Sequence, residues 1–311
     1  NAAVRTRFGR PASLLRGAAP AGEGAIPLRL DFRPPFDFGA TLDFLRARAI
    51  PGVERVGPDE YTRSVCIEGV VGAVSVRMHP TRSALVARVS SSLTSKLMPV
   101  AQRLRALFDL DARPQQIAAH LRRDPLLAPL VKRHRGLRIV GAFSGFETAV
   151  RVVLGQQVSV PAATTLSGRV AERFGGASGL EGVERIFPEP KVLAAATVSQ
   201  VRSVGVTEAR ARTIITLSRG VATGRIDLAT SEPEPLVAQL LELAGIGPWS
   251  AHAIALRALS WPDAFPGGDL VLRRALGVDS AREAEERAAE WAPWRAYAAM
   301  LLWRASSKGE D

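Results

Sequence analysis

The chain has 311 residues, 47% of them hydrophobic, so it is long enough for about two or three domains and too apolar to be disordered. Lys and Arg total 41 against 30 Asp and Glu, and the net charge of +11 points to a polyanion partner such as nucleic acid, or to an Arg-rich proteome. The single cysteine, Cys66, excludes disulfides within the chain, and no apolar run reaches membrane-spanning or secretory-signal length, so we expect a cytoplasmic protein with no membrane partner.

The first part of the chain predicts a tail, a linker and a small mixed domain. Residues 1–16 are typical of a short basic helix that ends at a Gly-Arg-Pro stop, and residues 17–24 are typical of a flexible linker. Strand-like alternation follows over residues 26–32, then helical spacing over 34–50, then short β-rich runs broken by Gly, Pro or Asp. Residues 25–113 therefore predict an antiparallel α+β domain with a helix across one face of its sheet.

Strand signals disappear after Asp111, and helical runs fill the rest of the chain. Ser144 followed by Glu147, and Ser280 followed by Glu283, predict capping boxes at two helix starts. We therefore predict a multi-domain α+β fold in which the small antiparallel domain precedes two all-α helical domains with a cleft between them. The predicted boundaries of the two helical domains are residues 114–143 with 262–311, and residues 144–261.

A tight turn at Gly245–Gly247 joins two apolar helical runs. The second run begins at Pro248, and a helix N-terminus exposes free N–H groups that bind a phosphate when glycines let it approach the backbone. The turn is therefore either a phosphate-binding hairpin or, as a bare GxG between helices more often is, an ordinary connection. Three backbone carbonyls on the other side of the turn are candidate ligands for a monovalent cation: those of Leu241, Leu243 and Ile246.

One carboxylate, Asp269, follows this hairpin at the start of another short helix. Its position allows two interpretations. It is either a catalytic acid that the phosphate-binding turn positions, or the N-cap of the helix that begins at Leu270, which would be the default from the pattern alone.

The hairpin and this carboxylate together resemble a known signature. The pattern L-x-G-I-G-x-W-S-A over residues 243–251, followed by F-P-x-x-D over 265–269, is similar to that of the helix-hairpin-helix–GPD superfamily of DNA glycosylases. The similarity looks closest to the AlkA-type 3-methyladenine DNA glycosylase II branch and covers about residues 26–305. It implies a small α+β domain and two helical domains, with the active site in the cleft between the helical pair. Further blocks that match this branch are residues 33–54, 107–114, 146–160 and 291–303.

The resemblance implies a mechanism that uses one acid. Asp269 would be the catalytic carboxylate, which stabilises the oxocarbenium character of the sugar and orients or deprotonates water. A methylated purine is already cationic, so its departure needs no strong general acid. Trp249 stands where strand-cutting members carry a lysine nucleophile, and no lysine lies near. The implied protein is a monofunctional glycosylase that leaves an abasic site and requires no cofactor.

The resemblance also assigns the residues around the flipped nucleotide. Gln157 would enter the gap that the flipped nucleotide leaves. At positions 253 and 270 this chain has Ala253 and Leu270, where the family pattern can have tyrosines. Plain structural alternatives are core packing for the aromatic residues, exposed helix-end polar groups for the glutamines and a solvated helix face for the arginine. The implied base pocket consists of Trp249, Trp294, Phe44, Gln156 and Leu270. The implied DNA contacts are Gln157, Gly245, Ile246, Gly247, Ser250 and Arg273.

Residues 1–16 resemble the last helix and tail of an AraC-type DNA-binding domain, and the chain begins at Asn1 rather than Met. We therefore expect the glycosylase part of a fusion with an Ada-like regulator. The predicted activity is hydrolysis of the N-glycosidic bond of alkylated purines in double-stranded DNA by a monomer. One alternative is a non-catalytic module that binds or senses damaged DNA, and another is a glycosylase for oxidised or mismatched bases.

Overall fold

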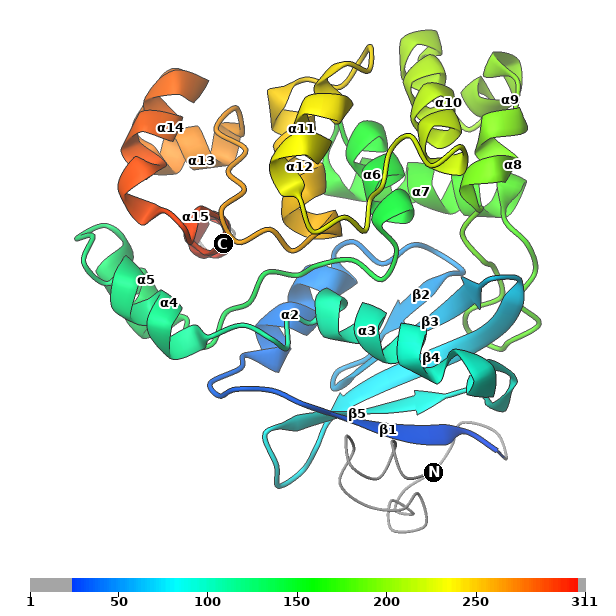
Figure 1. Cartoon of the computed structure of the whole chain (residues 1–311), viewed down its shortest axis with the longest axis horizontal. Helices are drawn as coiled ribbons and strands as arrows, with labels where there is room; N and C mark the ends of the chain where they lie inside the picture. Colours follow the sequence, from blue (N-terminus) through cyan, green and yellow to red (C-terminus); the bar gives the residue numbers. More distant parts are fainter. Residues whose placement is uncertain (1–23, 307–311) are drawn as a thin grey trace.

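Five antiparallel strands form one sheet in the order β1-β5-β4-β3-β2 (Figure 1). The computed structural model describes residues 24–306, so the basic segment predicted over residues 1–16 lies outside the described residues. The longest pairing joins β3 to β4, with Tyr61 opposite Val76, and both of these side chains are buried. The strands are β1 (Ile26–Asp31), β2 (Glu54–Val56), β3 (Glu60–Ile67), β4 (Val70–Met78) and β5 (Ala84–Val89).

Two helices pack against this sheet. Helix α2 (Phe38–Arg46) buries Leu42 and Leu45, and helix α3 (Leu97–Leu107) buries Val100 and Leu104; these side chains belong to the same hydrophobic cluster as the strands. Asp37 caps α2 by accepting the N–H of Ala40 at 2.8 Å. The predicted antiparallel α+β unit is therefore confirmed, with a short 3-10 helix η2 (Ser91–Lys96) leading into α3.

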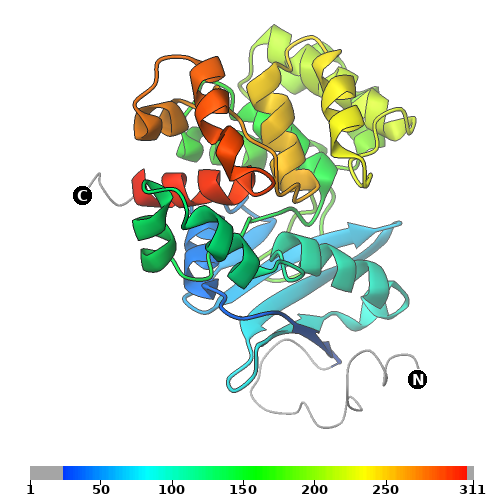
Figure 2. The ribbon, with the colours of Figure 1, turned by 60° about the vertical axis from the view of Figure 1, so that its left-hand side comes forward.

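The rest of the described chain is helical and lies over the sheet, as Figures 1 and 2 show from two sides. Within residues 24–306, none of these helices has the length and apolar character needed to cross a membrane. The first helices are α4 (Pro114–Leu121), α5 (Leu127–Arg133), α6 (Gly145–Leu154), α7 (Val160–Phe174), α8 (Pro190–Ala195), α9 (Val198–Arg202) and α10 (Glu208–Ala222). They are followed by α11 (Pro233–Leu241), α12 (Pro248–Ala258), α13 (Leu270–Leu276), α14 (Ala281–Ala288), η3 (Ala289–Trp291) and α15 (Arg295–Ser306).

Two hydrophobic clusters form the interior. The first contains side chains of the sheet, of α2–α5 and of α13–α15, so the sheet and the last helices share one core. The second contains side chains of α6–α12 together with Ile50 and Val53, which follow α2. The two clusters give the molecule a sheet-bound part and a purely helical part, and the predicted boundaries of the two helical domains stay predictions.

A buried set of charges joins the sheet to α6. Arg63 of β3 is paired with Glu147 of α6 at 2.6 Å, and Arg151 of α6 lies 3.2 Å from Glu54 of β2. Tyr61 donates its hydroxyl to Glu54 at 2.5 Å. Burial alone would raise the pKa of Glu54, but Arg151 and Arg63 outweigh it and lower that pKa. Removal of one partner from such a set leaves an uncompensated buried charge, which costs about 3–5 kcal/mol.

This charge set corrects part of one prediction. Ser144 caps α6 as predicted, since its hydroxyl accepts the N–H of Glu147 at 3.3 Å. The carboxylate of Glu147 does not return to Ser144 to complete a capping box, because it is bound to Arg63 instead. At Ser280 the N-cap also forms, with the N–H of Glu283 donating to the Ser280 hydroxyl at 3.2 Å, but the predicted capping box is again incomplete, because the Glu283 carboxylate accepts the Ser280 hydroxyl at 2.8 Å and the N–H of Asp279 at 3.3 Å.

A second buried polar contact joins the end of α3 to α15. The Tyr297 hydroxyl donates to the Asp109 carboxylate at 2.7 Å, and Arg138 donates to the Asp109 carbonyl at 3.1 Å. Burial raises the pKa of Asp109 from 3.8 to about 7, although Tyr297 and Arg138 act in the opposite direction. Burial and the neighbouring Asp109 also raise the pKa of Tyr297.

The raised pKa of Asp109 predicts a pH-dependent stability. The folded state keeps a proton on Asp109 that the unfolded chain releases, so this residue's contribution to stability is full below its unfolded pKa and is lost between about pH 4 and pH 7. An Asp109→Asn variant cannot titrate at this position. As the pH rises from about 4 to 7, we expect its free energy of unfolding to increase by up to about 4 kcal/mol relative to that of the natural protein. Asparagine also tolerates the positive φ of 50° at this position.

Urea unfolding of both proteins at several pH values measures this difference. The matched control is Asp59→Asn at an exposed aspartate. A stability difference between Asp109→Asn and the natural protein that does not change with pH would contradict the assignment.

Candidate active site

Asp269 is held by four N–H groups where the chain enters α13. Its Oδ1 accepts the backbone N–H groups of Val271 and Leu272, both at 3.0 Å, so Asp269 is the N-cap of α13. The same oxygen accepts the indole N–H of Trp303 at 3.0 Å, and Oδ2 accepts that of Trp249 at 3.2 Å. Oδ1 is thus fully used, and Oδ2 is the oxygen with acceptor capacity left for another molecule.

The loop before Asp269 is anchored in the first hydrophobic cluster. Phe265 is 1% exposed and packs edge to face on Trp291, with ring centroids 6.1 Å apart. The N–H of Asp269 donates to the Pro266 carbonyl at 2.8 Å, which fixes the turn into the helix. Leu270, the next residue, is half exposed, so the carboxylate lies near the surface beside an apolar side chain.

Trp303 was not among the predicted site residues. The sequence offered one signal, because Trp303 closes the 291–303 block that resembles the glycosylase family, but nothing in the sequence indicates which helix face it occupies. The structure places it on α15, where its indole N–H reaches Asp269. It binds Oδ1 of the carboxylate, whereas Trp249 binds Oδ2.

The turn at Gly245–Gly247 requires glycine at one of its two glycine positions. Gly245 has a φ of +88°, and a Cβ built there would lie 2.1 Å from the Thr213 hydroxyl of α10. Thr213 donates this hydroxyl to the Ala244 carbonyl at 2.9 Å, so α10 supports the turn from below. Ile246 is buried in the second cluster, whereas Gly247 faces open space as the N-cap of α12.

Gln156, predicted for the base pocket, is bound to this turn. Its Nε2 donates to the Gly245 carbonyl at 2.8 Å and to the Ser250 hydroxyl at 3.0 Å, and Ser250 is buried. Arg210 of α10 in turn donates to the Gln156 carbonyl at 2.6 Å. The adjacent Gln157 is exposed and has a φ of +55°.

The remaining predicted residues have other immediate partners. Trp294 packs edge to face on Tyr297 with ring centroids 5.9 Å apart, and Arg273 donates to the Asp279 carbonyl at 2.5 Å at the end of its own helix. In the part of the chain that the structure describes, no hydrogen bond or ring contact joins Trp294 or Phe44 to Asp269. The structure therefore brings Trp249 to Asp269 and Gln156 to the hairpin, and leaves the roles of the other residues as predictions.

Phe44 lies beneath two guanidinium groups. Arg48 of the α2 end is 3.8 Å from the ring centroid, and Arg257 of α12 is 5.0 Å away. Burial and the neighbouring Arg151 lower the pKa of Arg257 to about 9 and that of Arg48 to about 10, so both stay charged at neutral pH. The ring is already engaged in cation–π contacts within the protein.

The predicted cation ligands are backbone carbonyls. The carbonyl of Leu243 accepts the N–H of Ile246 at 3.0 Å, which leaves one of its two lone pairs for another contact. Carbonyl oxygens suit a hard monovalent ion, and Glu242 is the one charged residue between Leu241 and Ile246. In the described residues no cluster of His, Cys, Asp or Glu has the composition of a transition-metal site.

Known proteins match most of this chain. The model of the AlkA N-terminal domain matches residues 27–144, and that of the HhH-GPD superfamily base excision DNA repair protein matches residues 150–293. DNA-3-methyladenine glycosylase 2 of Escherichia coli is 31% identical over 275 residues, which cover 88% of this chain and 95% of that protein. The chain belongs to the HhH-GPD superfamily. The matched residues include the hairpin at Gly245–Gly247 and Asp269.

Two further relatives of this HhH-GPD protein define its extent and its fold. A probable bifunctional transcriptional activator/DNA repair enzyme AlkA of Mycobacterium tuberculosis is 37% identical over 298 residues, and the match covers 92% of this chain but only 58% of that protein. The chain therefore spans little more than half the length of that relative. The structure of 3-methyladenine DNA-glycosylase from Archaeoglobus fulgidus superimposes with a TM-score of 0.78 at 22% identity, covering 88% of this chain and 96% of that one.

The two glycines of the hairpin predict opposite sensitivities. Gly245→Ala would force a side chain into the left-handed region and against Thr213, so we expect a loss of about 2–4 kcal/mol in the free energy of unfolding. Gly247→Ala meets no atom, so its loss should stay below about 1 kcal/mol, the difference between glycine and alanine at an N-cap. Urea unfolding of both variants measures the contrast, and equal losses would show that the turn is not supported by α10.

Proposed function

We propose that the chain is a monofunctional DNA glycosylase that hydrolyses the N-glycosidic bond of alkylated purines, of the 3-methyladenine and 7-methylguanine type, and leaves an abasic site. The observation that carries the proposal is the carboxylate of Asp269 between two indole N–H groups, beside a hairpin whose N-cap glycine faces open space. A protein that only bound DNA would need no such carboxylate. Glycosylase activity is also what the names of the Escherichia coli and Archaeoglobus fulgidus proteins state for those proteins.

In the proposed reaction, Oδ2 of Asp269 faces the sugar. Oδ1 is occupied by three donors, so the carboxylate cannot rotate without breaking the cap of α13. An oriented negative charge near C1′ stabilises the oxocarbenium-like transition state, and Oδ2 can orient or deprotonate the attacking water. The leaving base is already cationic when it is a 3-alkylpurine, so the bond breaks without a second acid.

Trp249 supports hydrolysis by water rather than by a covalent intermediate. It occupies the position at which strand-cutting members of the superfamily carry lysine, and its indole donates to Asp269 at 3.2 Å. No lysine lies in the described part of α12 or α13, so a Schiff base with the sugar has no nucleophile here. The proposed product is an uncut strand with an abasic site.

The proposed contacts with DNA come from the elements around the hairpin. Gln157 would enter the gap left by the flipped nucleotide, while Gly247 and the start of α12 would bind a phosphate through backbone N–H groups. We further propose a monovalent cation on the carbonyls of Leu241, Leu243 and Ile246, and a monomer that acts on double-stranded DNA in the bacterial cytoplasm. The net charge of +11 supports a polyanionic substrate.

Substitution of the carboxylate tests the mechanism directly. We expect Asp269→Asn to lower the release of methylated purines from alkylated DNA by at least about a hundredfold, because it removes the charge while asparagine remains a good N-cap. Chromatography of the released bases and a binding assay on the same duplex separate chemistry from affinity, and affinity should persist. The matched control is Asp279→Asn at an exposed position three residues after the end of α13.

The same assay separates the proposal from its alternative. Release by Asp269→Asn at the natural rate would exclude this mechanism. Binding of alkylated duplex by the natural protein with no release of any base would instead favour a non-catalytic module that senses damaged DNA.

Trp303 is expected to act as a positioning residue for Asp269. Trp303→Phe keeps an aromatic ring and removes one donor from the carboxylate, so kcat for base release should fall about tenfold with little change in KM. Trp261→Phe is the control, because Trp261 stacks on His252 and does not bond to Asp269. A rise in KM with kcat unchanged, or a matching loss in the control, would assign Trp303 to packing alone.

A further inference from the structure

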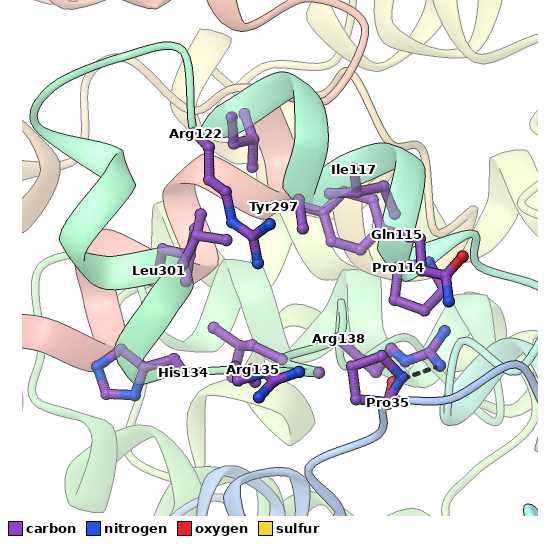
Figure 3. Close-up of a pocket in the computed structure, with 15 residues that line it drawn as sticks. Pro35, Pro114, Gln115, Ile117, Arg122, His134, Arg135, Arg138, Tyr297 and Leu301 are labelled. Carbon is purple, nitrogen blue, oxygen red and sulfur yellow. Dashed lines mark hydrogen bonds between the residues drawn. The ribbon is translucent and has the colours of Figure 1, made fainter.

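A cavity of about 260 Å³ lies away from Asp269, between the α4–α5 hairpin and α15 (Figure 3). Tyr297 and Leu301, one helical turn apart on α15, form one wall of it. Trp303 is two residues after Leu301, so at about 100° per residue the two side chains lie on roughly opposite faces of α15. Trp303 is the residue that donates to Asp269. Helix α15 therefore separates the cavity from the candidate active site.

The lining of this cavity combines an apolar floor with cationic groups. No acidic residue contributes to it in the described chain. Figure 3 shows the side chain of Arg122 entering from the end of α4 and that of Arg135 from the loop after α5, on opposite sides of the same space. Within residues 24–306 neither of these two arginines makes an ion pair. The apolar floor is formed by Pro35, Ile117, Leu121, Val131 and Leu301.

A third arginine, Arg138, is built into the wall. It is 1% exposed, and two of its nitrogens donate to backbone carbonyls, of Asp109 at 3.1 Å and of Arg33 at 2.5 Å. Its Nε is buried without a hydrogen-bond partner. The nearby Asp109 carboxylate interacts electrostatically with this guanidinium but makes no ion-pair contact with it, and its hydrogen bond is to the Tyr297 hydroxyl. A buried guanidinium with a donor to spare beside two unpaired arginines favours a bound anion.

We propose that this cavity binds a small carboxylic acid with one ring or a short branched chain. The anion would meet Arg122 and Arg135, and the apolar body would fill the floor between α4 and Leu301. An apolar cavity of about 150 Å³ takes a benzene ring, so a cavity of about 260 Å³ has room for a ring that carries a carboxylate. The site is independent of the proposed glycosylase activity, so the two proposals can fail separately.

Titration of the full chain with benzoate, followed by calorimetry and by saturation-transfer NMR, tests the site. Benzamide has the same shape without the charge, and inorganic phosphate has charge without the apolar body. We expect saturable binding of benzoate. Benzamide and phosphate should bind about tenfold more weakly, because benzamide lacks the negative charge and phosphate lacks the apolar ring. No saturable binding of benzoate, or equal binding of all three probes, would overturn the proposal.

Paired variants on the exposed side of α4 locate the binding. Arg122→Gln should weaken benzoate about tenfold and Arg123→Gln should not, since only Arg122 lines the cavity. Ala118→Phe fills the space and should abolish binding, whereas Ala119→Phe, on the neighbouring exposed position, should leave it intact. Unchanged melting temperatures of the free variants show that the fold is kept. Binding that survives both Arg122→Gln and Ala118→Phe would place the ligand elsewhere and refute this site.

Discussion

The pairing of Arg63 with Glu147 is the contact on which the geometry of the candidate site depends. It lies in the interior between the sheet and α6, where Arg151 and Glu54 complete the charge set. Charges in such a place tolerate little displacement, because each is stabilised only by its partners and the loss of one leaves another unpaired. Helix α6 is thereby fixed relative to β2 and β3. Its last turn leads into Gln156, whose side chain holds the hairpin, and into Gln157.

The candidate active site lies where the two hydrophobic clusters meet. Asp269 caps α13, which belongs to the cluster shared with the sheet, and it is bound by Trp303 of α15 in the same cluster. Trp249 precedes Ala251 and Ile254 on α12, which pack in the other cluster. The bond from Trp249 to Oδ2 of Asp269 therefore crosses from one core to the other. A change in the packing of either core would alter the direction of that carboxylate.

Periodicity and capping predicted most of the fold, because both depend on residues close in sequence. The five strands, the long helical part and the N-caps at Ser144 and Ser280 follow from local patterns, and so does the N-cap role of Asp269. The carboxylate of Glu147, predicted to complete a capping box, shows where prediction from local patterns fails. Its partner Arg63 lies 84 residues earlier, and no local pattern indicates that a strand arginine will reach it. Trp303 and Arg210 were missed for the same reason.

The family resemblance placed Gln156 and Phe44 in a base pocket, and the structure gives both residues defined partners. Gln156 donates to the hairpin, which is a task that a side chain at the end of α6 can perform whatever base is bound. Phe44 carries Arg48 and Arg257 over its ring, and these two cations would repel a cationic base placed beside them. Ala253 and Leu270 add no ring, so aromatic recognition in the proposed reaction falls chiefly on Trp249 and Trp294. A cation–π contact contributes about 0.5–2 kcal/mol per ring, so two rings give only moderate selectivity. In the proposed reaction the weakness of the glycosidic bond in an alkylated purine would therefore supply much of the discrimination, and Asp269 would act on every base that enters.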